Sequence, residues 1–190
     1  MAADFPKLRA ALAYGVSRLA VLSLMPRSKE PAIARGFHSA TTNPETIRRY
    51  WSVPDRNIGI ATGALSGVWV LDIDGDDGAT NLRTLEAQHG KLPKTWISST
   101  GRGWHVWFRY TAPIPSSTGR IAPSLDVKAD GGYVVAPPSI HPSGRAYVAG
   151  PARGRACRSA GLARHPCAQE AGAVDLGTGD REHPPAQWQA

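Results

Sequence analysis

Cysteine is scarce in this sequence, and the little that is present lies toward one end. The two cysteines, Cys157 and Cys167, give no disulfide framework to a chain of 190 residues, which fits a reducing compartment. Zinc is also disfavoured. Cys157, His165 and Cys167 do not follow a two-plus-two ligand spacing, and a fourth ligand would have to come from as far away as His183.

Long apolar runs and nucleotide-binding P-loops are absent as well. No apolar run is long enough to cross a bilayer, and the short stretch 19–25 fits a core strand better than a signal peptide. The sequence contains no Walker motif of the form G-x-x-x-x-G-K-[ST]. We therefore expect a cytoplasmic protein with no membrane partner and with no helicase motor in these residues.

Acidic residues are outnumbered, since 15 Asp and Glu stand against 22 Lys and Arg, for a net charge of +7. This balance suits a polyanionic partner such as nucleic acid. Composition changes after residue 150, where Ala, Gly, Arg and Pro dominate without helical or strand periodicity. We expect one domain over 1–150 and a flexible tail over 151–190; a truncation or an altered reading frame at this end stays open.

Apolar periodicity, caps and turn residues predict a mixed α/β fold. Two neighbour relationships are also predicted: strand 57–61 beside the strand that begins at residue 68, and strand 133–136 returning antiparallel to 125–128 through an Asp-Gly turn. Helices are expected over 7–15, 43–51 and 79–89, and strands over 19–25, 57–61, 68–74, 94–98, 104–110, 125–128, 133–136 and 145–148.

Two aspartates follow a buried, β-branched run and precede a glycine, in the order Asp72-Ile73-Asp74-Gly75. Side chains at i and i+2 of a strand share a face, about 6–7 Å apart, so both carboxylates would leave the sheet together. Such a pair can hold a hard divalent cation such as Mg²⁺ or Mn²⁺. The alternative is a polar strand end that simply enters an acidic turn.

Other polar groups are predicted to gather near these carboxylates. His105 and Arg109 share one face of a strand whose other face is apolar, and the preceding loop 99–103 offers backbone N–H groups and Arg102 for phosphate oxygens. Asp126 and Lys128 share a face of a further strand. Lys29 follows a strand on a proline-flanked loop, where a solvated lysine is the simpler explanation. The alternative for His105 is a hydrogen-bonded residue of the sheet. His141 lies near the site end of the hairpin that contains strand 133–136, and its alternative is an ordinary loop residue.

Three short motifs stand in a fixed order: Trp69-Val70-Leu71-Asp72-Ile73-Asp74, then Gly103-Trp104-His105, then Leu125-Asp126. Their order and flanks, including 57–63 before the first motif and 131–139 after the third, resemble the primase–polymerase family of the archaeo-eukaryotic primase superfamily, in the form found on plasmids, phages and prophages. The resemblance covers about 8–148. It implies an antiparallel sheet related to the RNA-recognition fold, flanked by helices.

The resemblance also implies a mechanism of nucleotidyl transfer on a single-stranded DNA template. Asp72, Asp74 and Asp126 would hold two Mg²⁺ or Mn²⁺ ions, and His105 would contact the phosphates of the incoming nucleotide. Deoxyribonucleoside triphosphates are the expected substrate, with ribonucleotides left open, and a separate replicative helicase is an expected partner. Further nucleotide contacts are predicted for Arg102, Lys128, Lys29 and Ser139.

Three other functions stay open from the sequence. A truncated, inactive remnant would bind nucleotide or single-stranded DNA without incorporation. A glycosyltransferase would explain the Asp-x-Asp but neither His105 nor Asp126, and a two-metal nuclease would cleave strands without added nucleotides.

Overall fold

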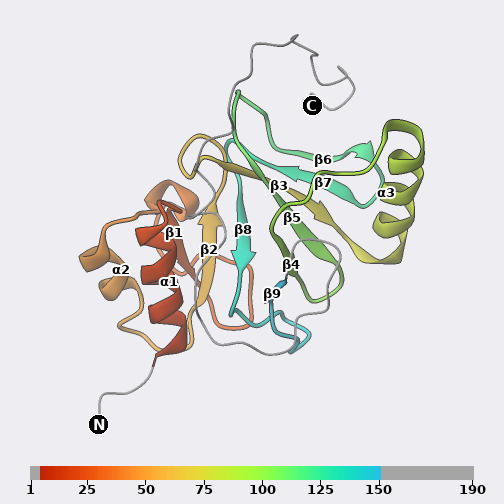
Figure 1. The fold of residues 1–190 in the computed structure, drawn as a ribbon. Coiled ribbons are helices and arrows are strands. Elements are labelled where there is room, and N and C mark those ends of the chain that lie inside the picture. Colours follow the sequence, from red (N-terminus) through yellow and green to blue (C-terminus); the bar gives the residue numbers. More distant parts are fainter. Residues whose placement is uncertain (1–4, 151–190) are drawn as a thin grey trace.

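The computed structural model describes residues 5–150, which combine helices with antiparallel sheets, so the expected mixed α/β class is confirmed (Figure 1). The expected relation to the RNA-recognition fold stays a prediction. The helices of this part are α1 (Pro6–Val16), the short 3₁₀ helix η1 (Gly36–Ser39), α2 (Pro44–Tyr50) and α3 (Gly75–His89). The strands are β1 (Val21–Leu24), β2 (Asn57–Ala61), β3 (Val68–Ile73), β4 (Ile97–Ser99), β5 (Trp104–Arg109), β6 (Ser117–Ala122), β7 (Leu125–Lys128), β8 (Tyr133–Ala136) and β9 (Val148–Gly150).

Local sequence explains where the first helices begin. Both α1 and α2 have proline in their first turn, where a missing N–H costs nothing because that group has no partner inside the helix. The side chain of Asn43 caps α2 by accepting a hydrogen bond from the Thr46 N–H at 2.9 Å. The helix predicted from residue 43 is therefore confirmed.

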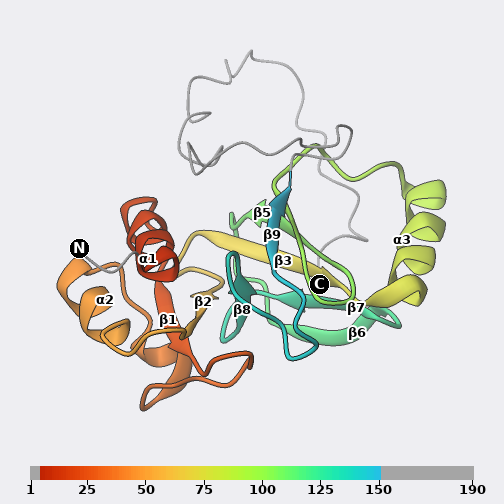
Figure 2. The same ribbon diagram turned by 90° about the horizontal axis from the view of Figure 1, so that it is seen from below.

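The strands form two antiparallel sheets. A three-stranded sheet has the order β1-β2-β8, and a six-stranded sheet has the order β6-β7-β3-β5-β4-β9. Helices α1 and α2 lie on the side of the three-stranded sheet, whereas α3 lies at the opposite end of the molecule, against the six-stranded sheet (Figures 1 and 2). Strand β3 is the central strand between β5 and β7, so residues at its end are placed by neighbours on both sides.

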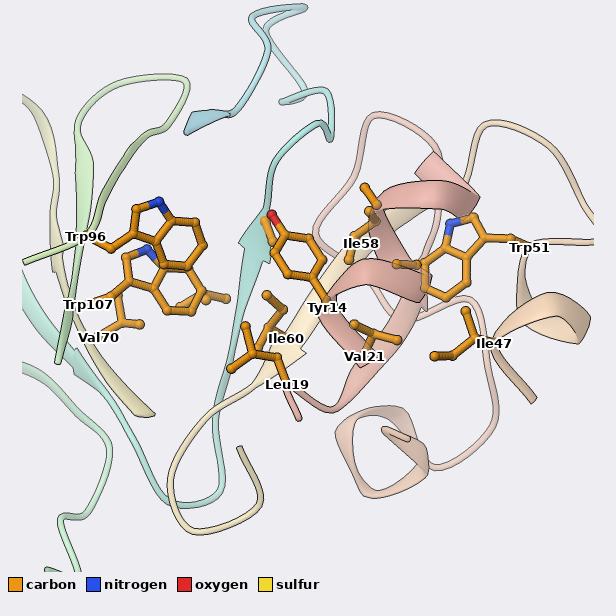
Figure 3. Close-up of a cluster of buried hydrophobic side chains, with 14 residues drawn as sticks. Tyr14, Leu19, Val21, Ile47, Trp51, Ile58, Ile60, Val70, Trp96 and Trp107 are labelled. Atoms are coloured by element: carbon orange, nitrogen blue, oxygen red, sulfur yellow. The ribbon is translucent and has the colours of Figure 1, made fainter. Parts of the chain in front are cut away.

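One apolar core joins the two sheets and the N-terminal helices. Tyr14 of α1 lies between Trp107 and Val70 of the large sheet and Ile58 of the small one (Figure 3). The Tyr14 hydroxyl donates to the Pro137 carbonyl at 2.9 Å, so its polar end is satisfied inside the core. A second core packs α3 on the other face of the six-stranded sheet, and therefore β3 is buried on both faces, as its apolar run predicts.

The two predicted neighbour relationships are wrong. Strand β2 pairs with β1 and β8 in the small sheet, whereas β3 belongs to the large one. Likewise β8 pairs with β2 instead of returning along β7. The turn after β7 crosses between the sheets because Asp130 is held there: its carboxylate accepts hydrogen bonds from the Tyr110 hydroxyl at 2.6 Å and from the Ala64 N–H at 3.1 Å.

Element boundaries differ from the prediction in several places. Helix α3 begins at Gly75, immediately after Asp74, and not at residue 79. The expected strands over 94–98 and 145–148 lie instead at Ile97–Ser99 and Val148–Gly150, and β6 was not predicted at all. The tail predicted over 151–190 lies outside the described residues, and the division into domain and tail stays a prediction. In residues 5–150 no helix is long and apolar enough to cross a membrane.

Candidate active site

The register of the large sheet brings the three sequence motifs together. Asp72 on β3 lies directly opposite His105 on β5 and directly opposite Asp126 on β7. Directly opposed residues of antiparallel strands share a face, with Cβ atoms about 4.5–5.5 Å apart. The first motif therefore lies between the other two, although they are 33 and 54 residues away in sequence (105 − 72 and 126 − 72).

Asp72 is a partly buried carboxyl with charges of both signs nearby. Its pKa is raised to about 6, mainly by burial; Lys128 and Lys29 act to lower it, whereas Asp126 and Asp74 act to raise it. A carboxylate in this position lacks sufficient positive charge around it. A bound cation would supply that charge.

Asp126 is held on both of its oxygens. Its Oδ2 accepts from Lys128 Nζ at 2.9 Å, and its Oδ1 accepts from the backbone N–H of Gly119 in β6 at 2.9 Å. Lys128 is two residues farther along β7, so it shares the Asp126 face, as its spacing predicts. The strand that was not predicted, β6, thus supplies one of the contacts that fix this carboxylate.

Asp74 lies just beyond β3 and precedes the first turn of α3. Its Oδ2 accepts from Arg102 Nη2 at 2.6 Å, and both side chains are exposed. Arg102 comes from the loop 100–103, which is closed by hydrogen bonds from the N–H groups of Arg102 and Gly103 to the Thr100 hydroxyl, at 3.2 and 2.9 Å. A side chain at Gly103 would overlap the Ile73 carbonyl, so this loop packs directly against the end of β3.

His105 is buried, and its ring faces Asp72. Its Nε2 lies 3.5 Å from Asp72 Oδ1, and its Nδ1 finds no hydrogen-bond partner among the residues that the structure describes. Burial lowers the pKa of His105 to about 3, with the charges of Lys29 and Lys128 contributing in the same direction. The ring is therefore neutral at pH 7, and its contact with Asp72 is not an ion pair.

The remaining predicted residues divide into two groups. Lys29 is exposed, and its charge reaches both Asp72 and His105; its loop is anchored by the Tyr133 hydroxyl, which donates to the Lys29 carbonyl at 2.8 Å. Ser139 is fully buried instead. Its Oγ accepts from the Ile58 N–H at 2.8 Å, so its hydroxyl supports the small sheet, and this position gives its predicted nucleotide contact no support.

Sequence reasoning missed one residue and left another undecided. Tyr147 is buried, and its ring centroid lies 6.0 Å from that of His105 and 6.0 Å from that of His141. Burial, together with the charges of Asp72 and Asp74, raises the pKa of Tyr147 to about 12. Nothing in the local sequence marks Tyr147, because the fold alone brings it to the carboxylates. The undecided residue is His141, whose pKa is affected by the charges of Lys29, Arg102 and Asp74, so this loop histidine lies beside the same site.

The donor set suits a hard divalent cation, since the three motif carboxylates offer only oxygen ligands and Asp72 lacks compensating charge. Lysine and arginine now neutralise two of them. Within 5–150, no three His, Cys, Asp or Glu side chains already converge as a metal-binding cluster. The residues fit a metal ion, but Arg102 and Lys128 would have to give up their carboxylate contacts.

Comparison with known families agrees with this constellation. Residues 11–165 match the model of a family described as "bifunctional DNA primase/polymerase, N-terminal". The chain belongs to the bifunctional DNA primase/polymerase family. The match contains all three motifs and confirms the resemblance inferred from them. This primase/polymerase family acts in DNA replication, with DNA and nucleotides as substrates. No curated protein matches the chain.

Proposed function

We propose that this chain is a DNA-dependent nucleotidyltransferase of plasmid, phage or prophage replication type. It would join a nucleotide to a 3′-hydroxyl on a single-stranded DNA template. The observation that carries the proposal is the cross-strand placement of Asp72 between His105 and Asp126, on one face of a rigid sheet. Family membership supports the reaction class, and the residues of the site support the chemistry.

In this proposal the carboxylates of Asp72, Asp74 and Asp126 hold two Mg²⁺ or Mn²⁺ ions. Such ions, when bound, activate the attacking hydroxyl and neutralise charge on the phosphates and the leaving pyrophosphate. The protein contributes the positions of the ligands. Asp72 and Asp126 are fixed by adjacent strands, and Asp74 by the junction of β3 and α3. Ligands on regular elements keep the precise placement that an in-line transfer needs.

His105 has a positioning role toward Asp72 in this scheme. Its neutral ring lies beside the Asp72 carboxylate, so it can orient a metal ligand without competing as a cation. The phosphate contact that the resemblance implies would be made from the same nitrogen, Nε2, since Nδ1 is buried. Lys29, Lys128 and Arg102 supply the positive charge for the triphosphate.

The template would bind through its phosphates. A net charge of +7 favours a polyanion, and Arg109 is an exposed cation at the end of β5, beyond the site. Affinity for single-stranded DNA should therefore fall steeply with salt. A separate replicative helicase, which would open the duplex and expose the template strand, is part of the proposal.

Extension of a labelled primer on a single-stranded template, with nucleotides and Mg²⁺ or Mn²⁺, tests the proposal. Asp72→Asn and Asp126→Asn should each reduce extension at least 100-fold, a loss of roughly the size expected when a group that stabilises the transition state is removed. Asp77→Asn is the matched control, because Asp77 is an exposed acid in the first turn of α3, outside the three motifs. It should extend like the wild type.

The outcomes separate the remaining functions. Extension by the wild type that Asp72→Asn abolishes supports the proposal, and omission of the primer then tests whether the enzyme starts chains. Template binding without extension by folded wild type would instead support the truncated remnant. Strand cleavage without nucleotides would support a nuclease. Parallel reactions with deoxyribonucleotides and ribonucleotides determine the preferred substrate.

A further inference from the structure

The loop between β8 and β9 is tightly closed on itself beside the carboxylates. The His141 N–H donates to the Arg145 carbonyl at 2.8 Å, the Gly144 N–H donates to the His141 carbonyl at 2.8 Å, and the Tyr147 N–H donates to the Ser139 carbonyl at 2.8 Å. These bonds hold the loop in one conformation. Side chains carried by it are therefore placed in advance, which lowers the cost of binding a ligand.

This loop packs against the loop that carries Arg102. Arg145 Nη1 donates to the Gly101 carbonyl at 3.1 Å, and a side chain at Gly101 would overlap the His141 ring. The imidazole therefore lies directly on the backbone of residue 101, next to the arginine that contacts Asp74. The Tyr147 ring lies between the two histidines, with its centroid 6.0 Å from the ring centroid of His141 and 6.0 Å from that of His105.

Hydrogen bonds fix which nitrogen of His141 carries the proton. Nδ1 accepts from the Ser143 N–H at 3.1 Å and lies 2.8 Å from the Ser143 hydroxyl, so it has no proton of its own. Nε2 then carries the hydrogen of the neutral ring and is a donor. Burial lowers the pKa of His141, and the charges of Lys29, Arg102 and Arg145 act with it, while Asp74 opposes them. A neutral donor thus faces a group of cations.

Positive charge is concentrated at this point. Lys29, Arg102 and Arg145 all act on His141, and a further cation is near, because a side-chain carbon at Gly144 would lie 3.3 Å from Arg27 Nη2. The charge of Asp74 acts to raise the pKa of His141, but the Asp74 carboxylate is already paired with Arg102. The cluster therefore suits an anion with several charges close together.

We propose that His141 and Arg145, together with Lys29 and Arg102, hold the β and γ phosphates of the incoming nucleotide. The inference rests on the proposed function and extends it to two residues outside the three motifs. The charge of Lys29 reaches Asp72, His105 and His141 alike, so the cluster adjoins the carboxylates where the α phosphate would react. A template strand fits less well, because its charges are spread singly along the backbone, whereas a triphosphate end is compact.

Binding of a fluorescent nucleoside triphosphate to the full chain, with Mg²⁺ and without DNA, provides the test. His141→Ala and Arg145→Gln should each weaken triphosphate binding about tenfold, as expected for loss of a hydrogen bond to a charged group. Binding of the matching monophosphate should not change. His141→Gln keeps an N–H near the position of Nε2 and should restore most of the affinity, whereas His141→Asn should not.

His89→Ala, at the end of α3, is the matched control and should bind triphosphate like the wild type. Inorganic tripolyphosphate should compete with the triphosphate for the wild type about tenfold better than for His141→Ala. Equal loss of monophosphate and triphosphate affinity, unchanged triphosphate affinity, or loss of template affinity alone would each overturn the inference. Thermal unfolding of every variant identifies misfolding; if His141→Ala misfolds, Arg145→Gln and His141→Asn decide the question.

The same proteins distinguish this inference from the proposed function. If the wild type binds triphosphate through His141 but extends no primer, the triphosphate site stands and the polymerase proposal fails. If the wild type extends primers with the same KM for nucleotide as His141→Ala, the polymerase proposal stands and the role of His141 is wrong.

Discussion

Arg102 Nη2 donates to Asp74 Oδ2 at 2.6 Å, and this contact joins the loop before β5 to the end of β3. Lys128 makes a similar contact with Asp126 at 2.9 Å. The two outer carboxylates are thus neutralised by protein cations, whereas the central Asp72 faces a neutral histidine. In the proposed reaction, Asp74 and Asp126 would instead hold metal ions, and Arg102 and Lys128 would then be able to contact phosphate. The pairs therefore balance the charge of Asp74 and Asp126 before the substrates arrive.

Arg102→Gln should separate the two roles of this arginine. Without the guanidinium, Asp74 is free for a cation, and we expect Mn²⁺ to bind several-fold more tightly to the protein alone. The affinity for nucleoside triphosphate should fall about tenfold, because a phosphate contact is lost. Titration calorimetry with Mn²⁺, and then with nucleotide at saturating Mn²⁺, measures both effects.

Arg83→Gln is the control for this experiment. Arg83 lies on α3 and donates to the Ala79 carbonyl and the Thr80 hydroxyl of its own helix, so its loss should change neither affinity. If Arg102→Gln weakened Mn²⁺ binding, Arg102 would be supporting the metal site instead of competing for it.

Asp72→Asn should stabilise the metal-free fold at neutral pH. The pKa of Asp72 is raised from 3.8 to about 6, so the folded state holds a proton that the unfolded state releases between these values. Wild-type stability therefore falls as pH rises from about 4 to 6 and stays lower above that, by about 3 kcal/mol. Urea unfolding should show the variant to be more stable at pH 7, with the difference shrinking toward pH 4.

Mg²⁺ should reduce the stability difference between Asp72→Asn and the wild type at pH 7. A bound cation stabilises the fold with the ionised wild-type carboxylate more than the fold with asparagine. If the difference in unfolding free energy between Asp72→Asn and the wild type were the same at pH 4 and pH 7, the ionised Asp72 would not destabilise the metal-free fold.

Much of the site could be predicted because its residues follow strand chemistry. The Asp72 and Asp74 spacing, the polar face of the strand with His105, and the pair Asp126 and Lys128 are all visible in short stretches of sequence. The structure then shows that these strands are neighbours, in an order that motif order alone does not reveal. Helix α2 could be predicted from its proline and its Asn43 cap, and α1 from its apolar stripe, for the same local reason.

What could not be predicted depends on contacts distant in sequence. The turn after β7 has the residues of a hairpin, but Asp130 is bound from segments around Ala64 and Tyr110, and these contacts direct the chain into the other sheet. Tyr147 reaches the carboxylates through the loop after β8, where its N–H donates to the Ser139 carbonyl. The nucleotide contact of Ser139 stays a prediction, and its hydroxyl accepts from the buried Ile58 N–H of β2, a contact that the local sequence does not reveal.

Gly103→Ala should disrupt both the fold and the site. A side-chain carbon there would overlap the Ile73 carbonyl, and the backbone on either side cannot move without disturbing β3 or β5. We expect a loss of roughly 1–3 kcal/mol in unfolding free energy, the cost of overpacking a filled space, and a loss of primer extension. Gly150→Ala is the control, because its nearest neighbour, the Ile97 carbonyl, would lie at an ordinary 3.5 Å. Unfolding in urea and extension assays on both variants would show whether loop 100–103 tolerates a side chain.

Asp130→Asn should weaken the crossing between the sheets in a pH-dependent way. The Tyr110 hydroxyl and the Ala64 N–H lower the pKa of Asp130, so its ionised form is favoured in the folded state. This contribution is present above the unfolded pKa of about 4 and is lost as pH falls through the lower folded value. The variant should therefore unfold at lower urea than the wild type at pH 7, and the two midpoints should approach each other toward pH 3. A gap that stayed constant with pH would mean that Asp130 acts through its shape and not through its charge.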